Sequence, residues 1–157
     1  MDTQDTEYLS REGYEELTKR LEMLRTKRRI EIAERLEYAK SLGDLSENAE
    51  YAEAKEEQMG NEAEIAKLED LLSRAKILKP GITSEVQIGA TVFCMRSNNG
   101  DISEQFMIVG REEADPMKGK ISNESPLGRA FLGKKKDEKV VVFTPKGSVE
   151  YLITNIA

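Results

Sequence analysis

One stretch of this chain constrains its fold more than any other, because it is long, free of proline and apolar at helical spacing. From Ser10 to Leu42 the only glycine is Gly13, near the start, and Ser10 is a favourable N-cap residue. Apolar residues recur at spacings of four and three, with a break at Arg28, at Leu17, Leu21, Leu24, Ile32, Leu36 and Ala39. This stretch therefore predicts a long amphipathic helix.

A second helix is expected after the step Leu42-Gly43-Asp44, because a continuous helix would rarely place glycine beside a capping aspartate. It would run to Lys79-Pro80-Gly81, which stops it. Its buried face is expected at Leu45, Ala49, Ala52, Glu56, Met59, Ala63, Ala66, Leu68, Leu71, Leu72 and Ala75. With Leu21 opposite Leu68, the two helices would form a slim antiparallel hairpin roughly 45 to 50 Å long. Periodicity alone fits a dimerising coiled coil equally well, and the glycine step favours the hairpin.

The pattern changes after Pro80 to short runs rich in β-branched and aromatic residues. Strands are expected at residues 91–95, 105–109, 139–143 and 148–153, with turns at 98–101 and 144–147. A short helix would begin at a Ser125 cap with Pro126 in its first turn. We therefore expect a two-domain α+β protein, with a coiled-coil hairpin in residues 1–79 and a compact α+β domain in residues 80–157.

The chain has no histidine and one cysteine, Cys94, which we expect to be buried in a strand. These counts exclude Ser-His and Cys-His nucleophiles and most catalytic zinc sites. The net charge of −6 disfavours independent binding to nucleic acid, because such affinity depends on counterion release from many phosphates. No apolar run is long enough for a membrane span and the N-terminus lacks a secretion signal, so we expect a cytoplasmic protein with no membrane partner.

Two carboxylates, Asp44 and Glu47, lie in the turn between the expected helices. As an N-cap aspartate followed by a glutamate at N3, they resemble a capping box, and spacing alone favours this structural interpretation. Their position favours a functional one, since carboxylates at the end of a thin rod can reach into a cavity of another molecule. Two carboxylates alone hold Mg²⁺ weakly. With further ligands from a partner they could complete a two-metal site and help activate water.

A basic cluster precedes this turn, and its arginines are candidates for contact with a short RNA strand: Arg25, Arg28, Arg29 and Arg35. The alternative, which we favour, is a solvated helix face whose arginines pair with nearby glutamates.

The string Gly43-Asp44-Leu45-Ser46-Glu47-Asn48-Ala49-Glu50-Tyr51 closely resembles the tip motif of bacterial transcript cleavage factors of the Gre family. The resemblance extends over nearly the whole chain, including residues 51–58, 88–92 and 121–130. The acidic segment after Tyr51 is more similar to the GreA branch of this family than to the GreB branch.

This resemblance implies an accessory transcription elongation factor that is not itself an enzyme. In the Gre family, the coiled coil enters the secondary channel of a backtracked bacterial RNA polymerase, and an FKBP-like C-terminal domain docks at the channel rim. The resemblance implies that Asp44 and Glu47 support a second Mg²⁺ ion and the attacking water while the polymerase active centre cuts the RNA 3′ segment. The factor would be a monomer with no cofactor of its own, sharing Mg²⁺ with the polymerase.

The resemblance also makes Ser125 and Pro126 candidate docking residues, with a purely structural helix start as an equal alternative. Two rival functions stay open. An FKBP-like domain could act as an interaction or prolyl isomerase module, for which only a few aromatic residues are available to line a pocket: Phe93, Phe106, Phe131, Phe143 and Tyr151. An anti-cleavage relative would occupy the same channel and inhibit, but such relatives carry extra tip acids where this chain has Leu45 and Ser46.

Overall fold

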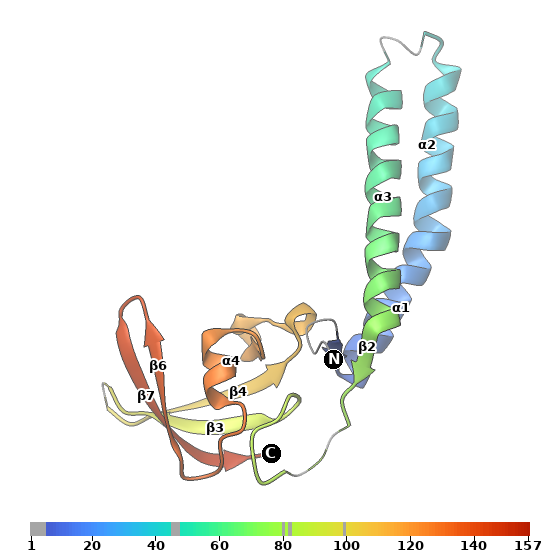
Figure 1. Ribbon diagram of the computed structural model, residues 1–157. Helices are drawn as coiled ribbons and strands as arrows, with labels where there is room; N and C mark the ends of the chain where they lie inside the picture. The colour runs from blue at the N-terminus through green and yellow to red at the C-terminus, as the bar shows by residue number, and fades with distance from the viewer. Residues whose placement is uncertain (1–5, 45–47, 80, 82, 99) are drawn as a thin grey trace. The chain divides into compact units, whose positions relative to one another are not determined.

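The computed structural model describes residues 6–44, 48–79, 81, 83–98 and 100–157 (Figure 1). Their contacts divide the chain into two compact units, one of Tyr14–Arg74 and one of Met1–Gly13 with Ala75–Ala157. The predicted two-domain α+β fold is confirmed. The expected boundary lay at residue 79, whereas the contacts group residues 6–13 with the C-terminal unit.

The Tyr14–Arg74 unit is the predicted antiparallel hairpin. Its first arm comprises α1 (Arg11–Met23), a π-helical turn η2 (Leu24–Arg28) and α2 (Arg29–Ser41), and its second arm is α3 (Ala49–Arg74). Figure 1 shows α2 and α3 running side by side. None of the helices in the described part of the chain combines the length and the apolar character that a membrane crossing requires.

The predicted buried face of the first arm is confirmed, since five residues of that face are less than a tenth exposed: Leu21, Leu24, Ile32, Leu36 and Ala39. The break in their spacing at Arg28 coincides with the η2 turn. A π-helical turn accommodates one residue more than an α-helical turn, so the apolar stripe returns to the same face beyond it.

The predicted buried face of α3 was wrong for its first half, because the alanine-rich run Ala49, Ala52, Glu56, Met59, Ala63 and Ala66 is exposed. The buried residues are instead Ala54, Asn61, Ile65, Leu68 and Leu71. Alanine is small enough to lie on either face of a helix, whereas Ile65 and Leu68 gain far more from burial. They pack with Leu21 and Leu24, so the expected proximity of Leu21 and Leu68 is correct.

One buried residue of the hairpin is polar. Asn61 is 7 % exposed, and its Nδ2 donates a hydrogen bond to the carbonyl oxygen of Leu24, the first residue of η2, at 3.2 Å. The Oδ1 atom of Asn61 has no hydrogen-bond partner among the described residues. The side chain therefore fixes α3 against the π-helical turn at the cost of one unsatisfied oxygen.

The other unit contains a five-stranded mixed sheet in the order β5-β4-β3-β7-β6. The strands are β3 (Thr91–Arg96), β4 (Ile102–Val109), β5 (Lys120–Ser122), β6 (Lys139–Thr144) and β7 (Gly147–Ile156). Within this sheet β4 and β5 pair in parallel, and the other neighbouring strands pair antiparallel. The four predicted strands and the helix α4 (Pro126–Phe131) are confirmed, and two short helical turns, η3 (Arg111–Glu113) and η4 (Pro116–Lys118), lie between β4 and β5.

The core of this unit lies between the sheet and α4, and Phe131 is its largest fully buried side chain. Cys94 is buried there as predicted. Burial, with a smaller contribution from the charge of Glu104, raises the pKa of its thiol from 9.0 to about 12. The thiol therefore stays protonated and unreactive at neutral pH.

A two-stranded parallel sheet of β1 (Glu7–Leu9) and β2 (Ala75–Ile77) completes this unit. At Gly110 a side-chain Cβ would overlap the backbone carbonyl oxygen of Tyr8, so glycine allows β1 to approach closely. The backbone N–H and hydroxyl of Ser10 both donate to the Glu113 carboxylate, at 2.7 and 2.5 Å. The Ser10 oxygen also accepts from the Gly13 N–H at 2.9 Å, which confirms Ser10 as the N-cap of α1.

Candidate functional site

The tip of the hairpin begins where Gly43 ends α2. Leu42 still has helical backbone angles, and Gly43 has a φ of 103°, a value that favours glycine. The N–H groups of Leu42 and Gly43 donate to the carbonyl oxygens of Ala39 and Lys40 at 3.2 and 3.4 Å. These bonds use carbonyls that the helix end leaves without intrahelical donors, so the predicted break is a true helix terminus.

Asp44 follows directly and is exposed. Its interpretation as the N-cap of the second helix was wrong, because α3 begins only at Ala49. The cap is Asn48, whose Oδ1 accepts a hydrogen bond from the Tyr51 N–H at 3.1 Å. Glu47 lies outside the described residues, so its placement beside Asp44 stays a prediction.

Asn48 is the residue of this site that sequence reasoning missed. Besides capping α3, its Nδ2 donates to the Ala39 carbonyl oxygen near the end of α2 at 2.5 Å. The signal was present, because asparagine is among the strongest N-cap residues and directly precedes Ala49. It was overlooked because the adjacent carboxylates were assigned to that role.

The four candidate arginines lie on the first arm, and each forms an ion pair with a glutamate of α3. Arg29 contacts Glu62 through two hydrogen bonds of 2.8 and 2.7 Å. The remaining pairs join Arg25 with Glu69, Arg28 with Glu57, and Arg35 with Glu50, Glu53 and Glu57. These are the pairs that the solvated-face alternative predicted, and contact with RNA stays a prediction.

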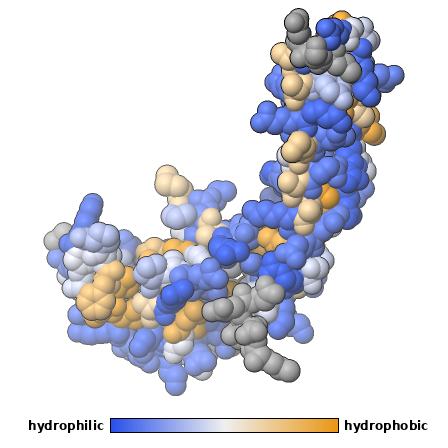
Figure 2. Space-filling model, turned by 45° about the horizontal axis from the view of Figure 1, so that its top comes forward, coloured by the Kyte–Doolittle hydropathy of each residue, from blue (hydrophilic) through white to orange (hydrophobic). Residues whose placement is uncertain are grey.

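These pairs shift the titration of their members. The hydrogen bond from Arg29 lowers the pKa of Glu62 below 4.5, and the same bond raises the pKa of Arg29. A hydrogen bond to Glu57 raises the pKa of Arg35 in the same way. Figure 2 shows a largely hydrophilic surface along the hairpin, as expected from these arginine–glutamate pairs.

Ser125 and Pro126 lie at the start of α4. The Ser125 oxygen accepts from the Gly128 N–H at 3.0 Å, and its hydroxyl donates to the Ser122 carbonyl at 2.7 Å. Ser125 therefore has the structural role that the alternative predicted. Pro126 is exposed, and docking through either residue stays a prediction.

The aromatic residues that an isomerase pocket would require pack mainly against one another. The ring centroids of Phe106, Phe131 and Tyr151 lie 5.6 to 6.1 Å apart. Phe143, in contrast, is 81 % exposed on β6. Three of the five candidate rings thus fill the core of the unit.

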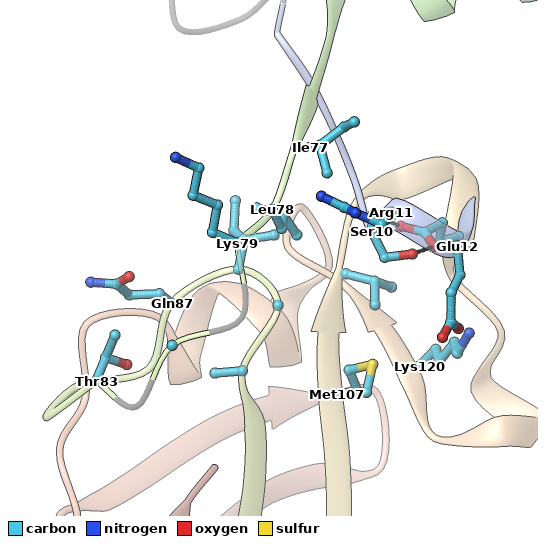
Figure 3. Close-up of a pocket in the computed structure, with 16 residues that line it drawn as sticks. Ser10, Arg11, Glu12, Ile77, Leu78, Lys79, Thr83, Gln87, Met107 and Lys120 are labelled. Carbon is cyan, nitrogen blue, oxygen red and sulfur yellow. Dashed lines mark hydrogen bonds between the residues drawn. The ribbon is translucent and has the colours of Figure 1, made fainter. Parts of the chain in front are cut away.

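The sheet-containing unit has a pocket of about 890 Å³, lined by the start of α1, the segment after β2 and part of β4 (Figure 3). Apolar side chains such as Met107 and Leu78 share its lining with Lys79, Lys120 and Glu12. None of the residues predicted from the sequence to form a site lines it. Among the residues that the structure describes, no group of three or more acidic, histidine or cysteine side chains could hold a metal ion.

Comparison with known proteins places both parts of the chain. Residues 7–77 match the family model described as transcription elongation factor, N-terminal, and residues 81–157 match transcription elongation factor, GreA/GreB, C-term. The chain is 42 % identical over 158 residues to transcription elongation factor GreA of Bacillus cereus, covering 99 % of each chain. It is 45 % identical over 150 residues to GreA of Bacillus subtilis, covering 95 % of each. A crystal structure of GreA factor homolog 1 of Thermus thermophilus aligns over 97 % of this chain and 99 % of that chain, with 32 % identity and a TM-score of 0.44.

Proposed function

Because this chain belongs to the GreA/GreB family of transcription elongation factors, we propose that it stimulates transcript cleavage by bacterial RNA polymerase. The hairpin tip enters the secondary channel of a backtracked polymerase in the cytoplasm, and the polymerase active centre hydrolyses the extruded RNA. The chain acts as a monomeric accessory factor rather than as an enzyme. The observation that carries this proposal is the position of Asp44, which is exposed and directly follows Gly43 at the end of the first arm of the hairpin.

The hairpin has the reach that this role requires. The 26 residues of α3 make a rod of about 39 Å at about 1.5 Å per residue. Its buried seam and the arginine–glutamate pairs hold the two arms together along this length. A slender rod of this kind can carry its end into a channel too narrow for the sheet-containing unit.

The tip acids suit a shared Mg²⁺ ion. Carboxylate oxygens are the ligands that this hard cation prefers, and the Asp44 side chain is exposed at the tip. Asp44 and Glu47 would hold the ion together with groups of the polymerase, and when bound the ion would supply an activated water. The chain itself contributes the position and negative charge of the two carboxylates.

The docking of the sheet-containing unit at the channel rim is part of the same proposal. Ser125 and Pro126 are its candidate contacts from the family resemblance. Figure 2 shows apolar surface gathered on this unit, which is consistent with a protein partner there. The arginines of the first arm are candidates for guiding the RNA 3′ segment once a partner competes for their glutamates.

The test uses backtracked elongation complexes with Mg²⁺, and it follows the release of short 3′ RNA fragments. The wild-type protein should accelerate release, and Asp44→Asn or Glu47→Gln should slow it by at least about 10- to 100-fold. Binding to the polymerase should not change. Asp70→Asn, the same substitution at an exposed position of α3, is the matched control.

Wild-type cleavage rates in both tip variants would overturn the proposal. Slower elongation in the presence of wild-type protein, without fragment release, would indicate the anti-cleavage function instead.

A further inference from the structure

The side chain of Asn48 joins the two ends of the hairpin that face each other across the tip. Its Oδ1 accepts from the Tyr51 N–H at 3.1 Å, and its Nδ2 donates to the Ala39 carbonyl at 2.5 Å. The first contact lies within the start of α3, and the second reaches nine residues back to α2. One side chain thus serves both helix termini.

Both partners lie at helix ends, where the regular i to i−4 hydrogen bonds stop, and the Ala39 carbonyl accepts from the Leu42 N–H at 3.2 Å as well as from Asn48. The last four carbonyls of α2 and the first four N–H groups of α3 have no intrahelical partners. A primary amide carries a donor and an acceptor on separate atoms, so it can serve a carbonyl and an N–H at once. An ionised aspartate can only accept, so it would cap α3 but leave the Ala39 carbonyl without this donor.

The two anchor points are themselves firmly held. Ala39 is completely buried, and Tyr51 packs against the apolar cluster of Ile32, Leu36 and Ala54, which is the last such cluster before the tip among the described residues. The Asn48–Ala39 hydrogen bond therefore joins the end of α2 to the start of α3 at a point where both helices are packed. Asp44 and Glu47 lie between these two residues in the sequence.

We propose that Asn48 is a positioning residue for the cleavage reaction, holding the end of α2 against the start of α3 so that Asp44, which follows α2, is presented in one position. This inference rests on the proposed function. Its physical basis is preorganisation, because joining the two helix ends in advance removes conformational freedom that the hairpin end would otherwise lose in the polymerase. Capping of α3 alone would not require an amide, whereas the link to α2 does.

The variants that separate these two roles are Asn48→Asp and Asn48→Ser. Both residues are good N-caps, so α3 should keep its stability in either variant. In Asn48→Asp the ionised side chain cannot donate a hydrogen bond to the Ala39 carbonyl. In Asn48→Ser the shorter side chain does not reach this carbonyl, and the change adds no charge near the tip acids. Asn155→Asp, the same change at an exposed position of β7, is the matched control.

Two measurements are made on the full-length protein. In the first, spin labels at Lys40→Cys and Ala52→Cys, in a Cys94→Ala background, report the distance distribution between α2 and α3. It should broaden in both Asn48 variants and not in the control. In the second, cleavage is followed at several factor concentrations. The maximal rate should fall by about 10- to 100-fold while the half-saturating concentration and the helix content are unchanged.

Unchanged distance distributions, or wild-type maximal rates in both variants, would overturn the inference and leave Asn48 as an ordinary cap. A loss of binding with an unchanged maximal rate would also contradict it. Failure of the proposed function has a different result, because the wild-type protein would then release no RNA fragments, and a role for Asn48 in the reaction would fail with it.

Discussion

Replacing the buried Asn61 with leucine should stabilise the hairpin, although it removes a hydrogen bond. The two side chains have the same branching and number of heavy atoms, so leucine is the apolar side chain nearest in shape to asparagine. Burial of its apolar surface contributes about 1.5 to 3 kcal/mol. Removing the unpaired Oδ1 contributes about 1 to 3 kcal/mol more. Loss of the donor to the Leu24 carbonyl costs about 1 to 3 kcal/mol.

The net effect of Asn61→Leu is a gain of about 2 kcal/mol in the free energy of unfolding, which corresponds to a rise in Tm of about 4 to 8 °C for a chain of this size. Urea denaturation followed by far-ultraviolet circular dichroism measures it, because most of the helix belongs to the hairpin. Ala63→Leu, which adds a leucine on the exposed face of α3, is the control and should change stability by less than about 0.5 kcal/mol.

A variant no more stable than the wild-type protein would refute this reasoning. It would mean that Oδ1 is well hydrogen-bonded in solution, so that the leucine gains nothing by replacing it. The complementary change, Asn61→Asp, should strongly destabilise the hairpin, because it buries a charge beside the Leu24 carbonyl.

Three further predictions concern the rest of the chain. The raised pKa of Cys94 means that the folded state resists ionisation of the thiol, so the free energy of unfolding should fall as pH rises from 9.0 towards 12. In urea titrations at increasing pH, Cys94→Ala should lose less free energy of unfolding than the wild-type protein. Gly110→Ala should cost about 1 to 3 kcal/mol, because the new Cβ overlaps the Tyr8 carbonyl, and amide exchange of β1 should quicken with it. The lowered pKa of Glu62 stabilises the folded state above pH 4.5, and this stability is lost as pH falls through the pKa of the folded state. Arg29→Gln should therefore lose less helix content than the wild-type protein when circular dichroism is followed to low pH. An unchanged acid titration would contradict the pairing.

The sequence was sufficient to predict the hairpin, its break at Gly43 and the four longer strands, because these depend on local chemistry and periodicity. It was insufficient for the buried face of α3, because exposed alanines at helical spacing have the same pattern as a buried helix face. The strands β1 and β2 were missed, since each has three residues and is stabilised by pairing with the other across the chain. Such pairing leaves no periodic signal.

The candidate site was predicted in part. Asp44 was identified from its position at the expected tip, and the structure describes it there. The assignment of Asp44 as the N-cap of the second helix was wrong, because two residues compatible with an N-cap, Asp44 and Asn48, stand four positions apart in the sequence. Only the observed start of α3 at Ala49 distinguishes them. The ion pairs of the arginines could be anticipated in kind, but their partners depend on the register of two helices.

The π-helical turn at Leu24–Arg28 also sets how the rest of the first arm, α2, is rotated about its helix axis. Each residue of an α-helix turns the chain by about 100° about its axis, so a single extra residue rotates the rest of the arm by that amount. Without the π-helical turn, Ile32, Leu36 and Ala39 would be rotated by about 100° from their present positions, out of the seam with α3. The turn, some fifteen residues before the tip along the sequence, therefore determines which face of α2 meets α3 up to the end of the hairpin.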